Sequence, residues 1–451
     1  MKRILFLICF VFGTASIYAQ KQWNLEDCLR HAQDNNITIK KAFLNTEISK
    51  QNHFQSKMAL LPNLNASLSD NTNFGRNIDP VTNQITIDRV RNNNFSLSSS
   101  ITLFNGFQSI NNIRKNNFDY LSSKYDAEKI ANDISVNIVT AYLQLLYNSD
   151  LVEVSQQKVD VSELQVERIS KMVEVGSLPK GDLLNTESQK AQEELQLINA
   201  QNQRDIAKLN LMQLLDLSVS ESFDVVQLEV EVDENYSTVG NQAVYALALE
   251  NLPDVKTAET KLKSSERSLA ISQGARSPRL SLSASVGTLY SDANRRLFYD
   301  SLGAIPTYQD YPFEDQFNDN VSQAISLSLS IPIFNNWQAN ASISRAKIGV
   351  LQAQYSVQEA KNNLRKTIEQ AQNDARSAQK KYIASKKAVA YQEESFQYTQ
   401  NKYDLQLVNS YDYNNAKNTL FKAETDLLQS KYDYLFKTKM LDFYMGKPLT
   451  F

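Results

Sequence analysis

The sequence predicts a mainly α-helical chain with a smaller β component, in which long coiled-coil helices form an α-helical barrel and short strands form part of a membrane β-barrel. Three observations predict this fold class. They are long stretches without glycine or proline, four short stretches with one apolar and one polar face, and an internal duplication.

Long helices are predicted where the chain lacks the residues that interrupt them. Neither glycine nor proline occurs between residues 107 and 175, between 182 and 239, or between 350 and 445. A helix over 108–174 would be roughly 100 Å long at about 1.5 Å per residue. Globular domains do not contain helices of that length, so we expect them to pack against one another as a rod or as the wall of a tube.

A coiled-coil seam supports this expectation. Apolar residues recur at spacings of three and four, and many alanines permit close helix approach. On its own, such a seam predicts packed, solvated helices and does not identify a function. The seam of the last stretch comprises Ile343, Ala346, Val350, Ala353, Val357, Ala360, Leu364, Ala371, Ala375, Ala378 and Tyr382, and a weaker seam in the first comprises Ile130, Ile134, Ile138, Ala141 and Leu145.

Four stretches of about ten residues alternate apolar residues with small polar ones, mostly serine. This length and alternation are typical of strands that cross an outer membrane. The apolar positions are Leu64, Ala66 and Leu68; Phe95, Leu97, Ile101 and Leu103; Leu280, Leu282, Ala284 and Val286; and Ile325, Leu327, Leu329 and Ile331. Aromatic residues near the strand ends suit either a membrane interface or ordinary packing; they are Phe74, Phe104, Tyr290, Phe334 and Trp337.

Four strands cannot close a barrel by themselves. Open strand edges in lipid leave unpaired backbone groups that cost several kcal/mol each. We therefore expect other copies of the chain to complete the barrel, and three copies give twelve strands (3 × 4). The polar stretches 75–94 and 291–320 are then outer loops.

An internal duplication organises the chain. Residues 32–42 (AQDNNITIKKA) align without a gap on 248–258 (ALENLPDVKTA), an offset of 216. Residues 103–108 (LFNGFQ) align on 333–338 (IFNNWQ), an offset of 230. The second copy therefore carries 14 extra residues (230 − 216) between its strands.

The duplication predicts the domain boundaries. The first repeat covers residues 20–237 and the second covers 238–451. The first contains a hairpin at about 63–104, a long helix pair at about 108–216 and an inter-repeat strand at about 225–233; the second contains a hairpin at about 279–334 and a long helix pair at about 338–446.

Residues 1–19 are predicted to be a secretory signal peptide. Lys2 and Arg3 precede an apolar run, and a small-residue segment ends at Ala19. Removing the two basic residues changes the formal net charge from −3 to −5 (−3 − 2), and this mild acidity argues against a nucleic-acid partner. Cys28 is then the only cysteine, so no intrachain disulfide forms, and we expect it to be a small packed residue on a short helix.

These segments together resemble the TolC (outer membrane efflux protein) family. The resemblance lies in residues 61–64 (LPNL), residues 103–107 (LFNGF), the run from Val175-Gly176 to residues 182–184 (DLL), and their partners in the second repeat. It implies a homotrimer with a 12-stranded barrel in the outer membrane and a 12-helix tunnel across the periplasm. It also implies docking onto a periplasmic adaptor protein and an inner-membrane pump of the RND, ABC or MFS class.

The resemblance further implies a periplasmic entrance closed by helix pairs that coil inward. The residues that match this entrance are Tyr403, Asp412, Asn415, Asp182 and Gly176. Tyr403 and Asp412 agree with the family pattern, Gly176 keeps an expected glycine, and Asp182 corresponds to a partner for closing hydrogen bonds.

Two positions depart from that pattern. Val408 stands where the family has arginine, and Asn415 stands where it has a second aspartate. Without the arginine, the salt bridge that locks some relatives shut lacks its cation. Whether this tip is locked by a salt bridge is therefore open.

Asp412 has two compatible interpretations. Threefold symmetry would bring three Asp412 carboxylates together, where like charges raise one another's pKa and attract cations. Alternatively, Asp412 and Asp182 are N-caps of the helices that follow them.

Other functional classes have less support. His31 and His53 have no metal-ligand partner in the sequence, and there is no phosphate-binding loop, nucleophile elbow or cysteine-rich metal spacing. We expect no enzyme activity, cofactor or metal. A periplasmic adaptor would have one helical hairpin between small β-domains, so the duplication and the four membrane-type strands count against it. An open passive porin would not need the long helices.

Overall fold

The computed structural model describes residues 22–78, 83, 85–87, 89–218, 223–226, 240–299 and 306–449. The chain divides into two compact units, each drawing on both halves of the sequence. Unit 1 comprises Met1–Leu44, Lys124–Lys256 and Glu359–Phe451, and unit 2 comprises Asn45–Ser123 and Thr257–Gln358.

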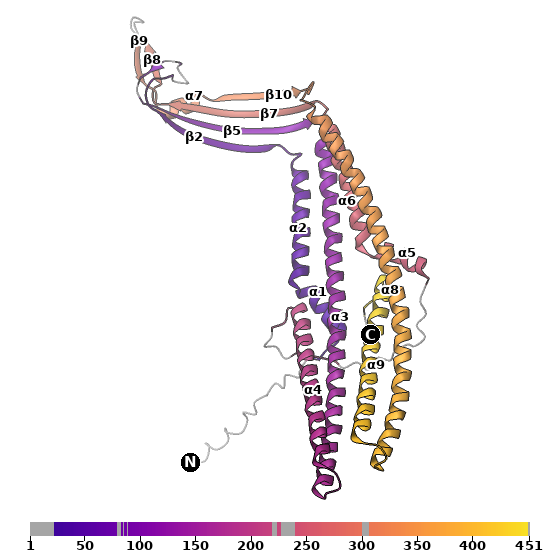
Figure 1. The fold of residues 1–451 in the computed structure, drawn as a ribbon. Coiled ribbons are helices and arrows are strands. Elements are labelled where there is room, and N and C mark those ends of the chain that lie inside the picture. Colours follow the sequence, from indigo (N-terminus) through magenta and orange to yellow (C-terminus); the bar gives the residue numbers. More distant parts are fainter. Residues whose placement is uncertain are drawn as a thin grey trace, which may run out of the picture. The chain divides into compact units, whose positions relative to one another are not determined.

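The long helices occur as pairs of equal length that repeat the sequence duplication (Figure 1). The pairs are α1 (Leu25–Asn35) with α5 (Asn241–Asn251), α2 (Ile37–Met58) with α6 (Pro253–Gly274), α3 (Gln108–Glu174) with α8 (Gln338–Asp404), and α4 (Lys180–Leu214) with α9 (Ser410–Tyr444). The first two pairs begin 216 residues apart and the last two begin 230 residues apart, as the aligned segments do. The helix predicted over 108–174 is confirmed, with 67 residues.

Left-handed backbone conformations recur at the same offset. Four pairs of residues 230 positions apart have positive φ: Gly106 and Asn336, Phe107 and Trp337, Gly176 and Gln406, and Asp216 and Gly446. The left-handed region costs an L-residue roughly 1–2 kcal/mol. Non-glycine residues adopt this conformation in both copies despite its cost. The two copies therefore share the same turn geometry even where their residue types differ.

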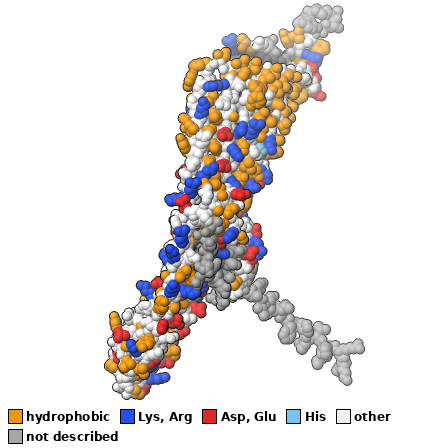
Figure 2. All heavy atoms as spheres, turned by 90° about the vertical axis from the view of Figure 1, so that its right-hand side faces the viewer, with side chains coloured by type: hydrophobic (Ala, Val, Ile, Leu, Met, Phe, Trp, Pro, Cys, Tyr) orange, Lys and Arg blue, Asp and Glu red, His pale blue; other side chains and the backbone are white. Residues whose placement is uncertain are grey.

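In unit 1 the long helices pack around two hydrophobic cores. In the larger core, the short parallel pair β1 (Gln22–Trp23) and β6 (Asp224–Val225) and helix α1 lie against α3, α4 and α9. Cys28 of α1 is fully buried there, which confirms the prediction of a packed residue on a short helix. The second core joins α5 and the start of α6 to α8 and α9 around Val244 and Ile368. On the face shown in Figure 2, acidic and basic side chains are interspersed.

A buried group of charged side chains connects α3, α4 and α9. Glu193 of α4 is 1% exposed, and Lys417 of α9 donates to its carboxylate at 2.8 Å. Lys158 of α3 has its Nζ 3.9 Å from the same carboxylate and 4.0 Å above the ring of Phe421. Burial lowers the pKa of Lys158, and the charge of Glu193 opposes that shift. Ser162 of α3 also donates to Glu193, so one carboxylate holds three helices together.

Unit 2 contains a four-stranded antiparallel sheet in the order β10-β7-β5-β2 (Figure 1). The strands are β2 (Asn63–Asn73), β5 (Val90–Phe104), β7 (Arg279–Ser291) and β10 (Ser322–Ser330), with 9 to 15 residues each. β2 and β10 each pair on one side only, so they are the two edges of the sheet.

The register places the apolar residues of neighbouring strands on one face. Leu97 pairs with Ala66 on β2 and with Val286 on β7, and cross-strand partners share a face. This apolar face is uncovered over much of its area, since Leu64 is 69% exposed and Ile325 is 82% exposed.

The alternation predicted for this strand is interrupted at Leu103. The register shifts between Thr102 and Phe104, and Phe104 rather than Leu103 pairs with Leu280. A β-bulge adds one residue to a strand, so every later side chain changes face. Simple alternation could not reveal this bulge.

The predicted outer loops have structure of their own. The first contains the short pair β3 (Asn77–Ile78) and β4 (Ile85–Thr86), and β5 already begins within it at Val90. The second, which holds the 14 extra residues (230 − 216), contains the antiparallel pair β8 (Arg295–Tyr299) and β9 (Pro306–Asp310) and the helix α7 (Phe313–Asp319). The predicted signal peptide and the part of the inter-repeat strand after Val226 lie outside the described residues.

We predict that Glu193→Gln destabilises the protein by about 3–5 kcal/mol, because two buried ammonium groups lose their shared carboxylate. The matched control is Glu194→Gln, since the neighbouring Glu194 is 49% exposed and pairs with Lys190 at 3.6 Å. The control should cost less than about 1 kcal/mol. Urea unfolding of the purified protein, followed by circular dichroism, measures both, and equal effects would contradict the role assigned to Glu193.

Replacement by alanine should change the stability of the protein in opposite directions at two glycines near the end of α3. Both Gly176 and Gly181 have nothing within 4 Å of a built Cβ, but Gly176 has φ +75° whereas Gly181 is helical. We predict that Gly176→Ala destabilises by about 1 kcal/mol, while Gly181→Ala stabilises by about 0.5–1 kcal/mol. The shift of the thermal unfolding midpoint measures each effect, and shifts of the same sign would refute this explanation.

Candidate functional site at the helix turns of unit 1

Two matching turns, α3 to α4 and α8 to α9, lie at one end of unit 1 (Figure 1). Each long helix ends in the same hydrogen-bond pattern. Ser177 N donates to Met172 O at 2.8 Å, and Leu407 N donates to Lys402 O at 2.9 Å. Gly176 and Gln406 take the left-handed position that this helix ending requires. The sequence predicted the glycine of the first turn but not the strained glutamine of the second.

The structure brings Tyr403 and Asp182 together between the turns. Both line a cavity of about 240 Å³ formed by the ends of α3 and α8 and the starts of α4 and α9. Val408 lines the same cavity. Gly176, Asp412 and Asn415 are not among its lining residues.

An ion pair that the sequence did not reveal lies beside this cavity. Arg168 of α3 donates to the carboxylate of Asp404 at the end of α8, and Arg168 also lines the cavity. Val408 cannot supply a cation, and the cation of this ion pair comes from α3 instead. Because Arg168 and Asp404 are 236 residues apart, only the packing of α3 beside α8 shows that they meet.

Aromatic side chains hold the start of α9 against the end of α8. Tyr403 stacks on Tyr413 with ring centroids 4.7 Å apart, and Phe396 lies 5.5 Å from the same ring. Burial raises the pKa of Tyr413 to about 12 and also raises the pKa of Tyr403. Both hydroxyls therefore stay protonated at neutral pH and can donate hydrogen bonds.

Asp412 and Asn415 lie three residues apart on the exposed surface of α9. The N-cap interpretation of Asp412 is wrong, because Asn409 is the N-cap and its Oδ1 accepts from Asp412 N at 2.9 Å. Asp182 is not an N-cap either, since Pro179 holds that position in α4. Both aspartates are in the first helical turn, where a carboxylate favourably meets the helix dipole. Their side chains are therefore free of the capping role.

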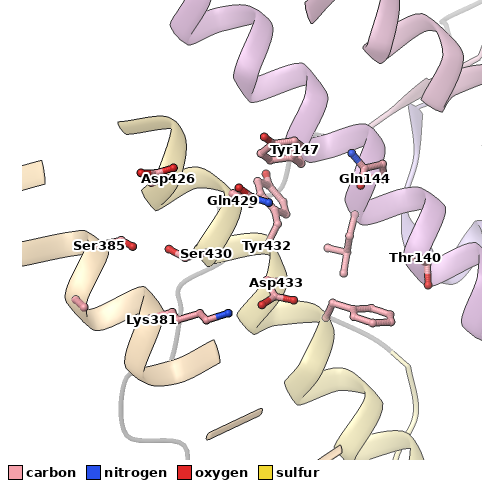
Figure 3. Close-up of a pocket in the computed structure, with 13 residues that line it drawn as sticks. Thr140, Gln144, Tyr147, Lys381, Ser385, Asp426, Gln429, Ser430, Tyr432 and Asp433 are labelled. Atoms are coloured by element: carbon pink, nitrogen blue, oxygen red, sulfur yellow. The ribbon is translucent and has the colours of Figure 1, made fainter. Parts of the chain in front are cut away.

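A larger hollow lies further along the helices (Figure 3). Its volume is about 730 Å³, and α3, α8 and α9 line it with mostly polar side chains, among them Gln144, Lys381, Asp426 and Asp433. Leu143 and Tyr432 also line the hollow and belong to the core around β1 and β6, so the hollow adjoins that core.

The two histidines have structural neighbours. His31 hydrogen-bonds with Asn35 at 3.2 Å and packs edge-on against Trp23, and His53 Nδ1 lies 3.2 Å from the carbonyl of Ile113. Among the described residues, no group of three or more His, Cys, Asp or Glu side chains is placed to hold a metal ion. None of the described helices has both the length and the apolar character needed to span a membrane.

Known proteins share this fold. VceC from Vibrio cholerae has a TM-score of 0.76 at 14% identity, with 94% of this chain and 96% of that chain covered. The open state of the Neisseria gonorrhoeae MtrE outer membrane channel has a TM-score of 0.74 at 17% identity, covering 95% and 90%.

Proteins similar to this chain in sequence have names of the same kind as the structurally similar ones. Outer membrane protein TolC of Escherichia coli (strain K12) is 24% identical over 307 residues, which cover 66% of this chain and 58% of TolC. The alkaline protease secretion protein AprF of Pseudomonas aeruginosa is 23% identical over 472 residues, covering 98% of this chain and 88% of AprF. The profile of the family described as outer membrane efflux protein matches residues 28–216 and 244–447. The chain belongs to the outer membrane efflux protein family.

Proposed function

We propose that three copies of this chain form a channel-tunnel in the outer membrane that exports substrates from the periplasm, or from an inner-membrane pump, to the outside. The tunnel is a passive duct of a tripartite efflux or type I secretion system, and it catalyses no reaction. Its partners are a periplasmic adaptor and an inner-membrane pump of the RND, ABC or MFS class.

The sheet of unit 2 carries this proposal. It has two unpaired edges, one exposed apolar face and one face rich in serine. Placed in a membrane, the apolar face meets lipid and the serine face lines water. Because lipid does not tolerate open edges, β2 of one copy pairs with β10 of the next, and three copies supply twelve strands (3 × 4).

The long helices supply the periplasmic part of the duct. α3, α4, α8 and α9 from three copies give twelve helices (3 × 4). In this proposal the hollow in Figure 3, which α3, α8 and α9 line, belongs to the tunnel interior. Its mixed polar lining supports a duct that accepts varied cargo, with selection left to the pump. Among the relatives, one is named a toxin and drug export protein and another an alkaline protease secretion protein.

The turns of unit 1 form the gate in this proposal. Arg168 and Asp404 join α3 to α8, and the stack of Tyr403 on Tyr413 joins α8 to α9. Asp412, exposed on the first turn of α9, forms with its copies the carboxylate ring at the entrance. Opening then separates the α8 and α9 pair from α3.

Single-channel currents in planar bilayers test the duct and its entrance. We expect wild-type protein to insert with a small, cation-selective conductance, and Asp412→Asn to lose much of that selectivity because three negative charges leave the constriction. The control is Asp426→Asn on the same helix, since Asp426 lines the wide hollow. A wild-type protein that never inserts would contradict the channel, and unchanged selectivity in Asp412→Asn would contradict the ring.

The Arg168 and Asp404 pair should bias the tip toward its closed state. Both side chains are partly exposed, at 45% and 42%, so the pair contributes at most about 1 kcal/mol per chain. Three pairs contribute up to roughly 3 kcal/mol, so Asp404→Asn should raise the open population by up to roughly a hundredfold. Channel recordings measure this population. The charge-swapped double variant Arg168→Asp with Asp404→Arg should restore closure, and a swap as open as the single variant would refute the lock.

A further inference from the structure

The short helix α7 lies in the second outer loop, where the sequence has its 14 extra residues (230 − 216). It packs on the sheet through aromatic rings. The Phe317 ring centroid lies 5.3 Å from that of Phe95 on β5, and the Phe313 centroid lies 5.2 Å from that of Tyr290 on β7. Thr288 Oγ1 also donates to the carbonyl of Phe317 at 2.8 Å.

The strand register identifies the face on which α7 lies. Phe95 pairs with Leu68 on one side and with Thr288 on the other, so these three side chains share a face. Two residues along the strands, Leu97 and Val286 point the same way. α7 therefore covers the apolar face of the sheet and not the serine face.

Buried hydrogen bonds fix α7 in this position. The side chain of Gln316 is fully buried, and its Nε2 donates to the carbonyls of Ser291 at 3.0 Å and Tyr311 at 2.7 Å. Its Oε1 accepts from Ser291 N at 3.1 Å. Asn320 Nδ2 donates to the carbonyl of Leu289 at 2.7 Å. With the middle of the helix and its C-cap bonded to β7, α7 cannot move to the other face without breaking these bonds.

An apolar groove of about 490 Å³ runs beside α7 on the same face. Leu68, Leu97 and Val286 form part of its floor, and Phe317 and Val321 line it from the side of α7. The groove is continuous with the exposed apolar side chains on the rest of this face of the sheet.

The polar side chains of this loop pair among themselves. Arg296 lies 3.8 Å from the carboxylate of Asp315, and Tyr311 donates to Asp319 at 2.5 Å. Phe313 and Phe317 remain 47% and 37% exposed although they are packed on the sheet. α7 thus combines a charged, internally paired side with exposed aromatic rings, which is typical of a helix at a membrane interface.

We propose that α7 is an interfacial helix on the outside of the barrel and that its groove holds an acyl chain of the outer leaflet. This inference rests on the proposed function, because the apolar face meets lipid only if the sheet is part of a membrane barrel. The groove continues that lipid-facing surface, which is why a lipid chain rather than a protein segment is its occupant. The extra residues of the second repeat then serve to attach the rim of the barrel to the membrane.

Site-specific fluorescence quenching in lipid vesicles tests this assignment. Cys28 is fully buried and should not react with a thiol-specific fluorophore in the folded protein, so single cysteines introduced on the surface can be labelled. The test positions are Val321→Cys and, in a second variant, Phe317→Cys. Leu327→Cys reports the apolar face of β10, and Ser326→Cys reports its serine face. Each labelled protein is reconstituted in phosphatidylcholine vesicles that contain lipid with a doxyl group on the acyl chain.

We expect the emission of the labels at 321, 317 and 327 to fall about twofold in the doxyl vesicles, because all three positions contact acyl chains. The label at 326 should keep its emission in these vesicles and be quenched by aqueous iodide. Quenching at 327 without quenching at 321 and 317 would overturn the assignment of α7 while leaving the barrel intact. No quenching at 327 would overturn the membrane barrel and this inference with it.

Discussion

The unpaired backbone groups along the outer edges of β2 and β10 are the constraint on which the rest of the structure depends. A four-stranded sheet with an exposed leucine-rich face is stable neither in water nor in lipid as a single copy, because water disfavours the face and lipid disfavours the edges. Pairing with further copies satisfies both demands together. In the proposed function the sheet therefore requires assembly, whereas the helical cores of unit 1 close within one chain.

The duplication gives each chain two versions of helices α1 to α4 and of strands β2 and β5, and the two versions differ in their turns and loops. The first turn uses Gly176 in the left-handed conformation, and the second uses Gln406 at the same position. Among the described residues, the first outer loop holds the short β3 and β4 pair, whereas the second holds the β8 and β9 pair and adds α7. The paired helices keep equal lengths although many of the residues along them differ, as the aligned segments 32–42 and 248–258 show.

The sequence could predict the features that depend on local periodicity. Missing glycine and proline located the helix over 108–174, and alternation located the strands. It could not predict the bulge at Leu103, because one extra residue does not change the composition of a strand recognisably. Nor could it predict that Arg168 meets Asp404, since that pair depends on the packing of helices far apart in the chain. Asp412 and Asp182 looked like N-caps because their residue type suits that role, yet Asn409 and Pro179 hold those positions.

The number of chains in the purified, detergent-solubilised particle tests the central claim most directly. Light scattering corrected for bound detergent measures the protein mass of the particle independently of its shape. Completion of the sheet by neighbouring copies predicts a particle of three chains whose mass does not change on dilution. A particle of one chain that keeps its strands and remains in solution would contradict the account, because the edges of β2 and β10 would then need no partner.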